Sequence, residues 1–504
     1  MDDTKHKIRI SKKLDENLAL LQDRMAIKEN FDVILRQMTV GRVKIALLFI
    51  DGLTNDQIVT LLLRHLVTLE QEDITLNTFE KLFAGHISYT EVDRAEYLED
   101  VIEKVLMGPQ ALLIDGQDQA IIIDARTYPV RSPEEPDLEK VVRGSRDGFV
   151  ETLVFNTALI RRRLRDPNLR MEIVSVGERS RSDVVVCYLK DVANPDLVRE
   201  IKERLQQVQI DGMPMAEKTL EELISPGSHW NPYPRVRYTE RPDVAAEHLL
   251  EGHVLLLVDT SPSVMITPVT FWHHLHHAEE YRQNPTIGVY LRWVRFIGVL
   301  VSVFLLPLWL LAVLQPEILP PALKFIGPNK IGNVPIVVQF LIAEIAIDMV
   351  RLATIHTPSS LATATGLIAA LLIGQIATTV GLFSPEVIMY AATATVGTFM
   401  TPSYELSFAN RLARLFLLFM VAAFRLPGLI IGFILLLVYL TTTRSFGVPY
   451  LWPLIPFNWT ALKTILIRTP VAMHNTRPSI LKPLQPVRQA VPVPARKPGS
   501  KRSR

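Results

Sequence analysis

The C-terminal half of this chain holds five long apolar runs, and they constrain its fold more than any other feature. The runs cover residues 296–314, 334–350, 361–383, 385–400 and 412–440. An α-helix rises about 1.5 Å per residue, so the first run nearly crosses a ~30 Å hydrocarbon core. The buried core helix of a soluble protein would explain one such run but not five. The sequence therefore predicts an α-helical, polytopic membrane domain over residues 296–443.

Charge is segregated along the chain, and this segregation predicts the orientation in the membrane. All 52 acidic residues lie at or before Glu405, whereas the final segment, residues 444–504, is basic and rich in proline. Arg292 and Arg295 close a connector, residues 271–295, that precedes the first run. Under the positive-inside rule, both ends of the membrane domain are cytoplasmic. We also expect the end of this tail, residues 477–504, to be unstructured and bound to lipid, because its many prolines disfavour helix and anionic headgroups attract its basic residues. The competing outcome is an ordered tail that docks on the α/β region.

Two cytoplasmic ends require an even number of crossings, which five runs do not give directly. Four crossings result if one of the short runs, 334–350 or 385–400, is re-entrant or faces a pore. Six result if the last run bends back at Pro427. The sequence leaves both arrangements open.

The run at residues 334–350 contains two acidic residues and is followed directly by an arginine. Glu344, Asp348 and Arg351 are spaced i, i+4 and i+7, which places them on one helical face. A charge at the centre of a lipid-facing helix costs roughly 2.5–3.5 kcal/mol, so this face should meet water or protein. One interpretation is structural, as an interfacial amphipathic helix or an Asp348–Arg351 pair that locks two helices. The other is a pore or cavity lining whose net negative face favours cations.

The run at residues 361–383 predicts close helix packing. Small residues recur in it at every fourth position, namely Ala362, Gly366, Ala370 and Gly374. Such a stripe lets helix backbones approach one another in lipid. The packing partner is a helix of the same subunit or of a neighbouring one, and the sequence leaves this choice open.

Residues 1–290 are charged throughout and predict an α/β cytoplasmic region. A Pro- and charge-rich linker divides it into two small α/β subdomains, residues 1–130 and 140–270. Helical periodicity, with Asn194 as an N-cap, predicts helices at residues 13–29, 55–70, 148–164, 195–207 and 242–250. Apolar runs and turn residues place strands at 43–51, 111–115, 119–124, 170–176, 183–190 and 253–259.

The chain contains no recognisable catalytic or cofactor-binding motif. Residues 327–332 lack the Lys-Ser/Thr of a phosphate-binding loop, and neither G-x-G-x-x-G nor H-E-x-x-H occurs. His273 and His277 have the i, i+4 spacing of a metal pair, but a juxtamembrane helix at the headgroup level is the favoured interpretation. The basic run at residues 161–165 lies in an acidic half, which favours a solvated, partner-docking or lipid-facing surface. We therefore expect no enzymatic activity, cofactor, metal or nucleic-acid partner.

Four short motifs lie between residues 143 and 451. They are R-G-S-R-D-G-F at 143–149, T-E-R-P-D at 239–243, V-D-T-S-P at 258–262 and S-F-G-V-P-Y-L at 445–451. Together they resemble signatures of the GerA family of bacterial spore germination proteins. The motif positions include Arg143, Gly144, Arg146, Gly148, Phe149, Asn156, Glu240, Arg241, Pro242, Asp243, Asp259 and Pro262. In the membrane half, I-H-T-P at 355–358 and T-P-S-Y-E-L at 401–406 most resemble the stage V sporulation protein AF branch. Classical receptor A subunits carry different residues where this chain has I-H-T-P.

The resemblance implies a multi-pass protein of the spore inner membrane whose N- and C-terminal parts are cytoplasmic. It implies a non-enzymatic role in germination signalling and monovalent cation release, within a homo-oligomer or a ring with other germination membrane proteins. Subunits of the dipicolinate channel and of germinant receptors are the partners that it suggests, besides membrane lipid. The AF branch further implies that the protein amplifies the response linked to dipicolinic acid release. The alternative is the A subunit of a nutrient germinant receptor.

Overall fold

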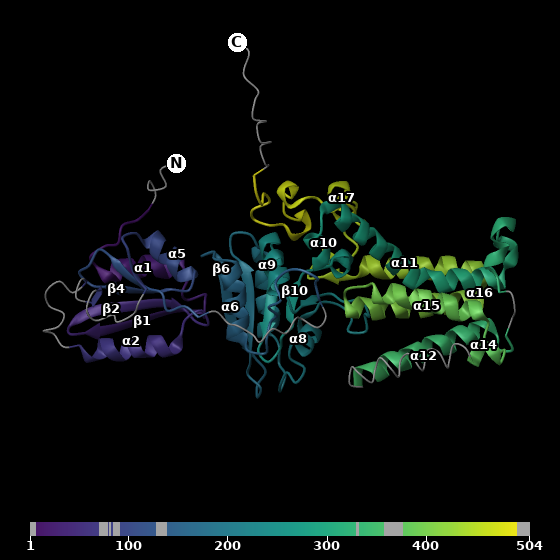
Figure 1. The fold of residues 1–504 in the computed structure, drawn as a ribbon, viewed down its shortest axis with the longest axis horizontal. Helices are drawn as coiled ribbons and strands as arrows, with labels where there is room; N and C mark the ends of the chain where they lie inside the picture. The colour runs from purple at the N-terminus through teal and green to yellow at the C-terminus, as the bar shows by residue number, and fades with distance from the viewer. Residues whose placement is uncertain are drawn as a thin grey trace, which may run out of the picture.

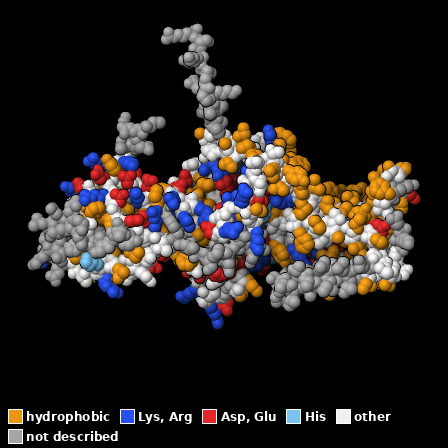
Figure 2. Space-filling view, viewed as in Figure 1, with side chains coloured by type: hydrophobic (Ala, Val, Ile, Leu, Met, Phe, Trp, Pro, Cys, Tyr) orange, Lys and Arg blue, Asp and Glu red, His pale blue; other side chains and the backbone are white. Residues whose placement is uncertain are grey.

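The structure, a computed structural model, describes residues 7–69, 79, 82–83, 91–127, 139–328, 332–356 and 376–490. Three parts follow one another along the molecule: an α/β unit, a second α/β unit and a helical region (Figure 1). The predicted fold class, an α/β region of two small subdomains followed by a helical domain, is confirmed for these residues. Charged side chains gather on the α/β units, whereas the visible surface of the helical region is mainly hydrophobic (Figure 2).

The first α/β unit is an antiparallel sheet with helices on both faces. Its strands are β1 (Val33–Val40), β2 (Val43–Ile50), β3 (Val92–Ala95), β4 (Gln110–Ile114) and β5 (Ala120–Ile123), in the spatial order β1-β2-β4-β5-β3. Side chains of β2 alternate between the two faces. Leu48 joins the core formed with α1 (Leu14–Arg24) and α5 (Leu98–Leu106). Leu47 joins the core formed with α2 (Asp56–Thr68). The predicted hairpin is β4–β5.

The second α/β unit repeats this design. Its strands are β6 (Leu169–Val176), β7 (Ser182–Leu189), β8 (Arg237–Thr239), β9 (Val254–Val258) and β10 (Val264–Thr267), in the order β6-β7-β9-β10-β8. One face is covered by α6 (Leu153–Arg163) and α9 (Pro242–Glu251), the other by α7 (Pro195–Gln206) and α8 (Ala216–Ile224). The predicted N-cap is confirmed, since the Asn194 side chain accepts a hydrogen bond from Asp196 N. The shared strand order of the two units was not predicted from the sequence.

The helix predicted at residues 148–164 begins only at Leu153, so its predicted start is wrong. The Asn156 side chain holds the backbone of Val150 through hydrogen bonds to its N–H and carbonyl groups. Asp259 Oδ1 accepts a hydrogen bond from Leu153 N at 3.2 Å, from a position far away in the sequence. These bonds satisfy the backbone outside a helix and override the local helical pattern.

A buried ion pair joins the two α/β units. Arg161 of α6 donates two hydrogen bonds to Asp32 of the first unit, at 2.9 and 3.0 Å, and both side chains are 1% exposed. Next to this pair, Asn30 Oδ1 accepts a hydrogen bond from Met171 N of β6 at 2.8 Å. The basic run that sequence analysis assigned to a surface therefore contributes Arg161 to the contact between the units.

The helical region contains the predicted apolar runs as α11 (Pro285–Leu314), α12 (Ile336–His356), the short α14 (Ala377–Thr379), α15 (Pro385–Phe399) and α16 (Tyr404–Thr442). Among the described residues, two helices, α11 and α16, are long and apolar enough to cross a membrane. Most of the run at 361–383 lies outside the described residues, including Ala362, Gly366, Ala370 and Gly374. Its predicted packing stripe therefore stays a prediction.

Helix α16 is a hairpin of two antiparallel arms. Its backbone leaves helical geometry at Arg425, with φ 58° and ψ −136°. Beyond this point Gly432 packs on Leu417 and Met420, residues of the first arm. The alternative in which the last run bends back is thus observed, with the reversal at Arg425 rather than at Pro427.

The described part of the C-terminal segment folds back on the second α/β unit, which contradicts the predicted unstructured tail over residues 477–490 and matches the competing outcome. After α17 (Trp459–Leu466), the chain runs along the second α/β unit. Arg488 pairs with Glu247 of α9 through both guanidinium Nη atoms, at 2.5 and 2.8 Å. Leu484 N donates to Val192 O at 2.9 Å. The segment contains two short 3₁₀ helices, η7 (Val471–Met473) and η8 (Ser479–Leu481), and Arg488 finds its acidic partner within the same chain.

The two α/β units should fold without the helical region. All but one of the buried core side chains of both units come from residues 10–269, the exception being Phe446. We expect residues 1–285, expressed alone, to unfold in one cooperative thermal transition followed by circular dichroism. A compact product that lacks near-ultraviolet signal and binds a hydrophobic dye would contradict this expectation.

Candidate functional site

A cluster of charged side chains lies inside the helical region, where four helices meet. Its centre is Glu344 of α12, which is 1% exposed. Glu344 Oε2 forms ion pairs with two arginines of α16, Arg414 at 2.8 Å and Arg411 at 3.1 Å. Spacing of i, i+3 puts both guanidinium groups on the α16 face that meets α12.

Arg414 extends the cluster to the other two helices. Its Nη1 donates to the Ser302 carbonyl of α11 at 2.6 Å and to Thr398 Oγ1 of α15 at 3.3 Å. Arg411 Nη2 donates to the Glu344 carbonyl at 2.6 Å. Glu344 therefore connects α12 to α16, and Arg414 connects α16 to α11 and α15.

Asp348 and Arg351 lie at the edge of the same cluster. Asp348, 37% exposed, forms an ion pair with Arg411. The Arg351 guanidinium lies over the rings of Phe408 and Tyr404, at 4.2 and 4.8 Å from their centroids. The predicted helical face thus exists, but its principal partners are arginines of α16.

The pairing of Glu344 and Asp348 with arginines bears on whether this helical face is structural or lines a pore. Burying an unpaired carboxylate in an apolar region is costly, and a buried pair is tolerated when its geometry and hydrogen bonds are good. Here two carboxylates face three guanidinium groups, so the cluster carries no net negative charge. It fits the structural interpretation, in which charges lock helices together. Whether Glu344 also faces a conducting path stays a prediction.

The cluster has unused hydrogen-bonding capacity. Among the described residues, Glu344 Oε1, Arg411 Nε and Arg414 Nε are buried without a hydrogen-bond partner. Buried polar atoms of this kind usually bind water or an ion, or change partners during function. The charged cluster can therefore form further hydrogen bonds with a water molecule or another polar ligand.

Close packing between α11 and α15 depends on glycine. A side chain at Gly397 would collide with the carbonyl of Gly298 on α11, and a side chain at Gly298 would collide with Met400. The predicted small-residue stripe belongs to another run, yet the same principle operates here.

Motif residues of the second α/β unit join distant segments around Arg241. This side chain is 1% exposed and pairs with Asp243 at 2.8 Å. It also donates to the carbonyls of Glu139 and Ser145. Asp243 also pairs with Arg282 of α10 (Ala278–Arg282), a short helix in the connector to α11. Burial opposes ionisation of Asp243, but the two guanidinium groups outweigh it and hold the pKa of Asp243 below its ordinary value.

Glycine is required at one point of this network. Gly144 has φ +138°, and the Arg282 guanidinium lies directly over its Cα, where a side chain would clash.

Phe149 is fully buried in the core of the second unit, and its N–H donates to the Glu240 carbonyl at 2.8 Å. Arg143 and Arg146 are exposed, whereas Gly148 and Pro242 are buried and Pro262 lies beside the buried Ser261. The motif positions that the structure brings together hold the second unit to the connector.

A second buried ion-pair group lies where the connector enters α11. Glu280 is fully buried and pairs with Arg292 at 2.8 Å and with Arg295. Arg292 also donates to the carbonyls of Thr464 and Ile465 in α17. The two arginines that predicted the orientation of the first run are thus structural residues of this junction.

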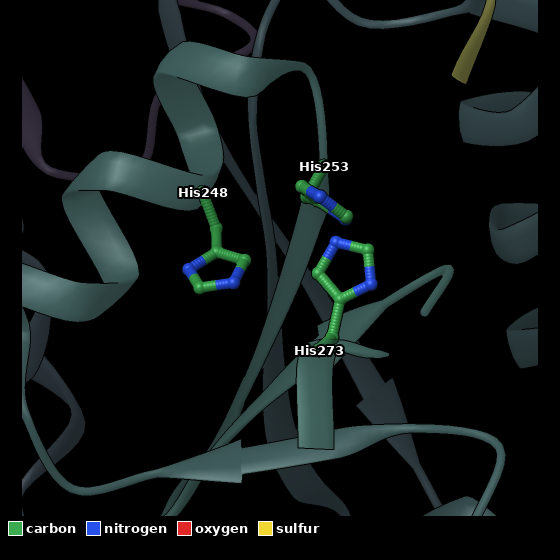
Figure 3. A group of neighbouring side chains, drawn as sticks. All are labelled: His248, His253 and His273. Carbon is green, nitrogen blue, oxygen red and sulfur yellow. The ribbon is translucent and has the colours of Figure 1, made fainter. Parts of the chain in front are cut away.

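The histidines of residues 273–277 do not form the predicted juxtamembrane helix. The segment is divided into a short 3₁₀ helix, η3 (Phe271–Leu275), and α10, for which His277 is the N-cap. His274 is 1% exposed and its ring lies against Tyr450. The backbone is extended at His276 and His277, and this break separates η3 from α10, so the segment is not one continuous helix. His273 approaches His248 and His253 rather than pairing with His277 (Figure 3).

Sequence reasoning missed the partners of the predicted charged face. Neither Arg411 nor Arg414 was predicted as a partner. Two arginines spaced i, i+3 at the start of a long apolar run are the signal that could have identified them, since charges in an apolar region require partners.

Comparisons with known proteins agree with the resemblance in the motifs. A profile described as "Bacillus/Clostridium GerA spore germination protein" matches residues 21–480. The chain is 48% identical to stage V sporulation protein AF of Bacillus subtilis (strain 168), over 97% of this chain and 99% of that protein. It is 29% identical to spore germination protein B1 of the same organism, over 96% of this chain and 100% of that protein.

One solved structure is also similar. It is the N-terminal domain of the A subunit of the Bacillus megaterium spore germinant receptor GerK3. The match has 24% sequence identity and a TM-score of 0.40, and it covers 53% of this chain and 99% of that domain.

Proposed function

Because the chain belongs to the Bacillus/Clostridium GerA family of spore germination proteins, we propose that it is a multi-pass subunit of the spore inner membrane. It acts in germination signalling and in the release of monovalent cations. It amplifies the response linked to dipicolinic acid release, and this role involves no catalysis. The observation that carries the proposal is the 48% identity to a stage V sporulation protein AF over nearly the whole length of both chains.

The proposed topology has six crossings, with both α/β units and the C-terminal segment in the cytoplasm. The α16 hairpin supports six rather than four. Its reversal lies next to the end of α11, where Leu426 N donates to Gln315 Oε1. Its second arm returns to the second α/β unit, where Asn231 Nδ2 donates to Thr443 Oγ1. Each arm falls in the range of roughly 17–25 residues that spans a bilayer core.

The proposed role also implies assembly with other membrane proteins. Candidate partners are further copies of the chain, subunits of the dipicolinate channel and germinant-receptor subunits. Several relatives are named as spore germination proteins, including the KA, A1 and B1 proteins of Bacillus subtilis. The apolar surface of the helical region would meet both lipid and these partners (Figure 2).

Deleting the gene in a spore former that carries it should slow dipicolinate release with every nutrient germinant that is tested. An amplifier acts after the individual receptors, so its loss affects all of them. Dipicolinate fluorescence recorded separately for each nutrient measures this, with the restored gene as control. Normal kinetics with all nutrients would exclude the proposed role.

The second candidate function is the A subunit of a nutrient receptor. It is favoured by identities of 28–30% to spore germination proteins over 90% or more of this chain. In that case the deletion abolishes the response to one class of nutrient and leaves the others unchanged. The same recordings therefore separate the two functions.

A further inference from the structure

Three histidines from three separate elements meet at the junction between the second α/β unit and the connector. They are His248 in α9, His253 directly before β9, and His273 in η3. One ring nitrogen of each lies within 4.8 Å of those of the other two. The ring centroids are 5.1, 5.1 and 6.0 Å apart, and the rings face a common space (Figure 3).

The second nitrogen of His248 is available to a metal, whereas that of His273 becomes available only in its other tautomer. His248 Nδ1 lies 2.8 Å from the Val244 carbonyl, which can only accept a proton, so Nδ1 donates and Nε2 keeps its lone pair. His273 Nδ1 accepts a hydrogen bond from the backbone N–H of Thr270 at 3.0 Å and lies 2.9 Å from the Thr270 hydroxyl, so the neutral ring carries its proton on Nε2 in this arrangement. Metal binding at Nε2 requires this proton to move to Nδ1, which then donates to the Thr270 hydroxyl. Backbone and hydroxyl partners of this kind orient metal-binding histidines.

His253 is the least well paired of the three rings, with the Pro268 backbone and the Glu251 carboxylate as its polar neighbours. It is completely buried, and neither ring nitrogen has a hydrogen bond among the described residues. A buried imidazole in this state has lost hydration without replacement, which costs about 1–3 kcal/mol. A ligand that binds His253 would recover this cost.

The protonation state of the three rings suits a metal. Burial lowers the pKa of His253 to about 4 and holds the pKa of His248 and His273 well below the ordinary value. All three are therefore neutral at neutral pH, the form in which imidazole binds a metal ion.

The charges around the site are balanced. Arg237 donates to the His273 carbonyl, and its positive charge opposes a cation, but it is paired with Glu139 at 2.9 Å. On the other side, Glu251 Oε2 lies 3.8 Å from His253 Nε2. Among the described residues, Glu251 is the one acidic side chain with an oxygen within 4 Å of a ring nitrogen of these histidines.

We propose that His248, His253 and His273 bind a divalent transition-metal ion of the zinc class, with Glu251 or a water molecule as the fourth ligand. Zinc binds imidazole nitrogen at about 2.0–2.1 Å, so tetrahedral ligation requires nitrogens about 3.4 Å apart. Side-chain movements of about 1 Å bring the observed nitrogens to that separation. The metal would tie α9 and β9 of the second unit to η3, and thus to the connector that enters α11.

The test uses the full-length protein in detergent, purified through a tag without histidine and stripped of metal. Titration with Zn²⁺ should show one tight site per chain, and Co²⁺ should give the intense visible absorption of a tetrahedral nitrogen-rich site. His248→Ala, His253→Ala and His273→Ala should each weaken Zn²⁺ binding by at least about tenfold, since losing only an outer-shell partner already costs about 10–100-fold. His229→Ala, at an exposed position of the same unit, is the matched control and should bind normally.

Two results would overturn the proposal. One is a wild-type protein that binds neither metal, or binds Co²⁺ only in octahedral geometry. The other is unchanged Zn²⁺ binding in His253→Ala. Because a histidine variant could fail to fold, its circular dichroism is compared with that of the metal-free wild type. If a variant is unfolded, the Co²⁺ spectrum of the wild type alone decides.

Discussion

Replacing Arg414 by methionine should remove most of the protein from the membrane. The change keeps the length of the side chain but leaves the buried Glu344 carboxylate with Arg411 as its remaining cationic partner. It also removes the hydrogen bonds to α11 and α15. Removing one partner from a buried ion pair costs about 3–5 kcal/mol, a large part of the stability of a typical domain. Immunoblots of membrane fractions and the thermal midpoint in detergent measure the loss.

Two further variants show whether the lost ion pair is the reason for the lower abundance. Asp348→Asn affects the half-exposed edge of the cluster, where an ion pair is worth at most about 1 kcal/mol, so its abundance should be nearly normal. The double variant Glu344→Leu with Arg414→Leu removes both charges and should accumulate better than Arg414→Met. Normal accumulation of Arg414→Met would contradict the proposed role of the charged cluster in holding the helices together.

The same cluster allows the pore interpretation to be tested through Glu344→Gln. Glutamine keeps the shape but leaves two guanidinium groups without their shared carboxylate, so we expect lower abundance. Normal abundance with reduced cation release would instead place Glu344 on the conducting path. Normal abundance with normal release would remove Glu344 from any pore.

Substituting leucine for Gly397 is the other change with a large expected effect. The new side chain would collide with the Gly298 carbonyl and force α11 and α15 apart. Overpacking costs about 1–3 kcal/mol or more, and here the obstacle is backbone, which does not move aside. We expect loss of the folded protein from membrane fractions. Ala392→Leu adds bulk at an exposed position of α15 and should be tolerated; equal abundance of the two variants would refute the packing argument.

The elements that were predicted well are those whose signal is local. The apolar runs that became β2 and β9 and the Asn194 cap all depend on residues that are neighbours in the sequence, as does the α16 reversal, which the sequence offered as one of two alternatives. The start of α6 was wrong because Asp259, far along the chain, holds Leu153. The docked C-terminal segment was only the competing outcome for the same reason, since Arg488 finds its partner Glu247 only in the folded chain.

The α12 side of the candidate site was predicted from the sequence, but its partners on α16 were not. The spacing of Glu344, Asp348 and Arg351 identified a polar helix face, because helical periodicity alone places them together. Their pairing with Arg411 and Arg414 depends on how α12 and α16 pack, which no local pattern encodes. The histidine group shows the same limit: His273 was noticed beside His277, but the ligand set forms only when η3 reaches α9 and β9.

The central claim, a role in cation release during germination, is tested most directly by K⁺ efflux from spores. Flame photometry or a K⁺ electrode can follow efflux after a nutrient is added to wild-type spores, to spores that lack the gene, and to spores with the gene restored. The account predicts delayed and reduced K⁺ efflux in the deletion strain, with recovery on restoration. K⁺ efflux that is unchanged in time and amount would contradict it.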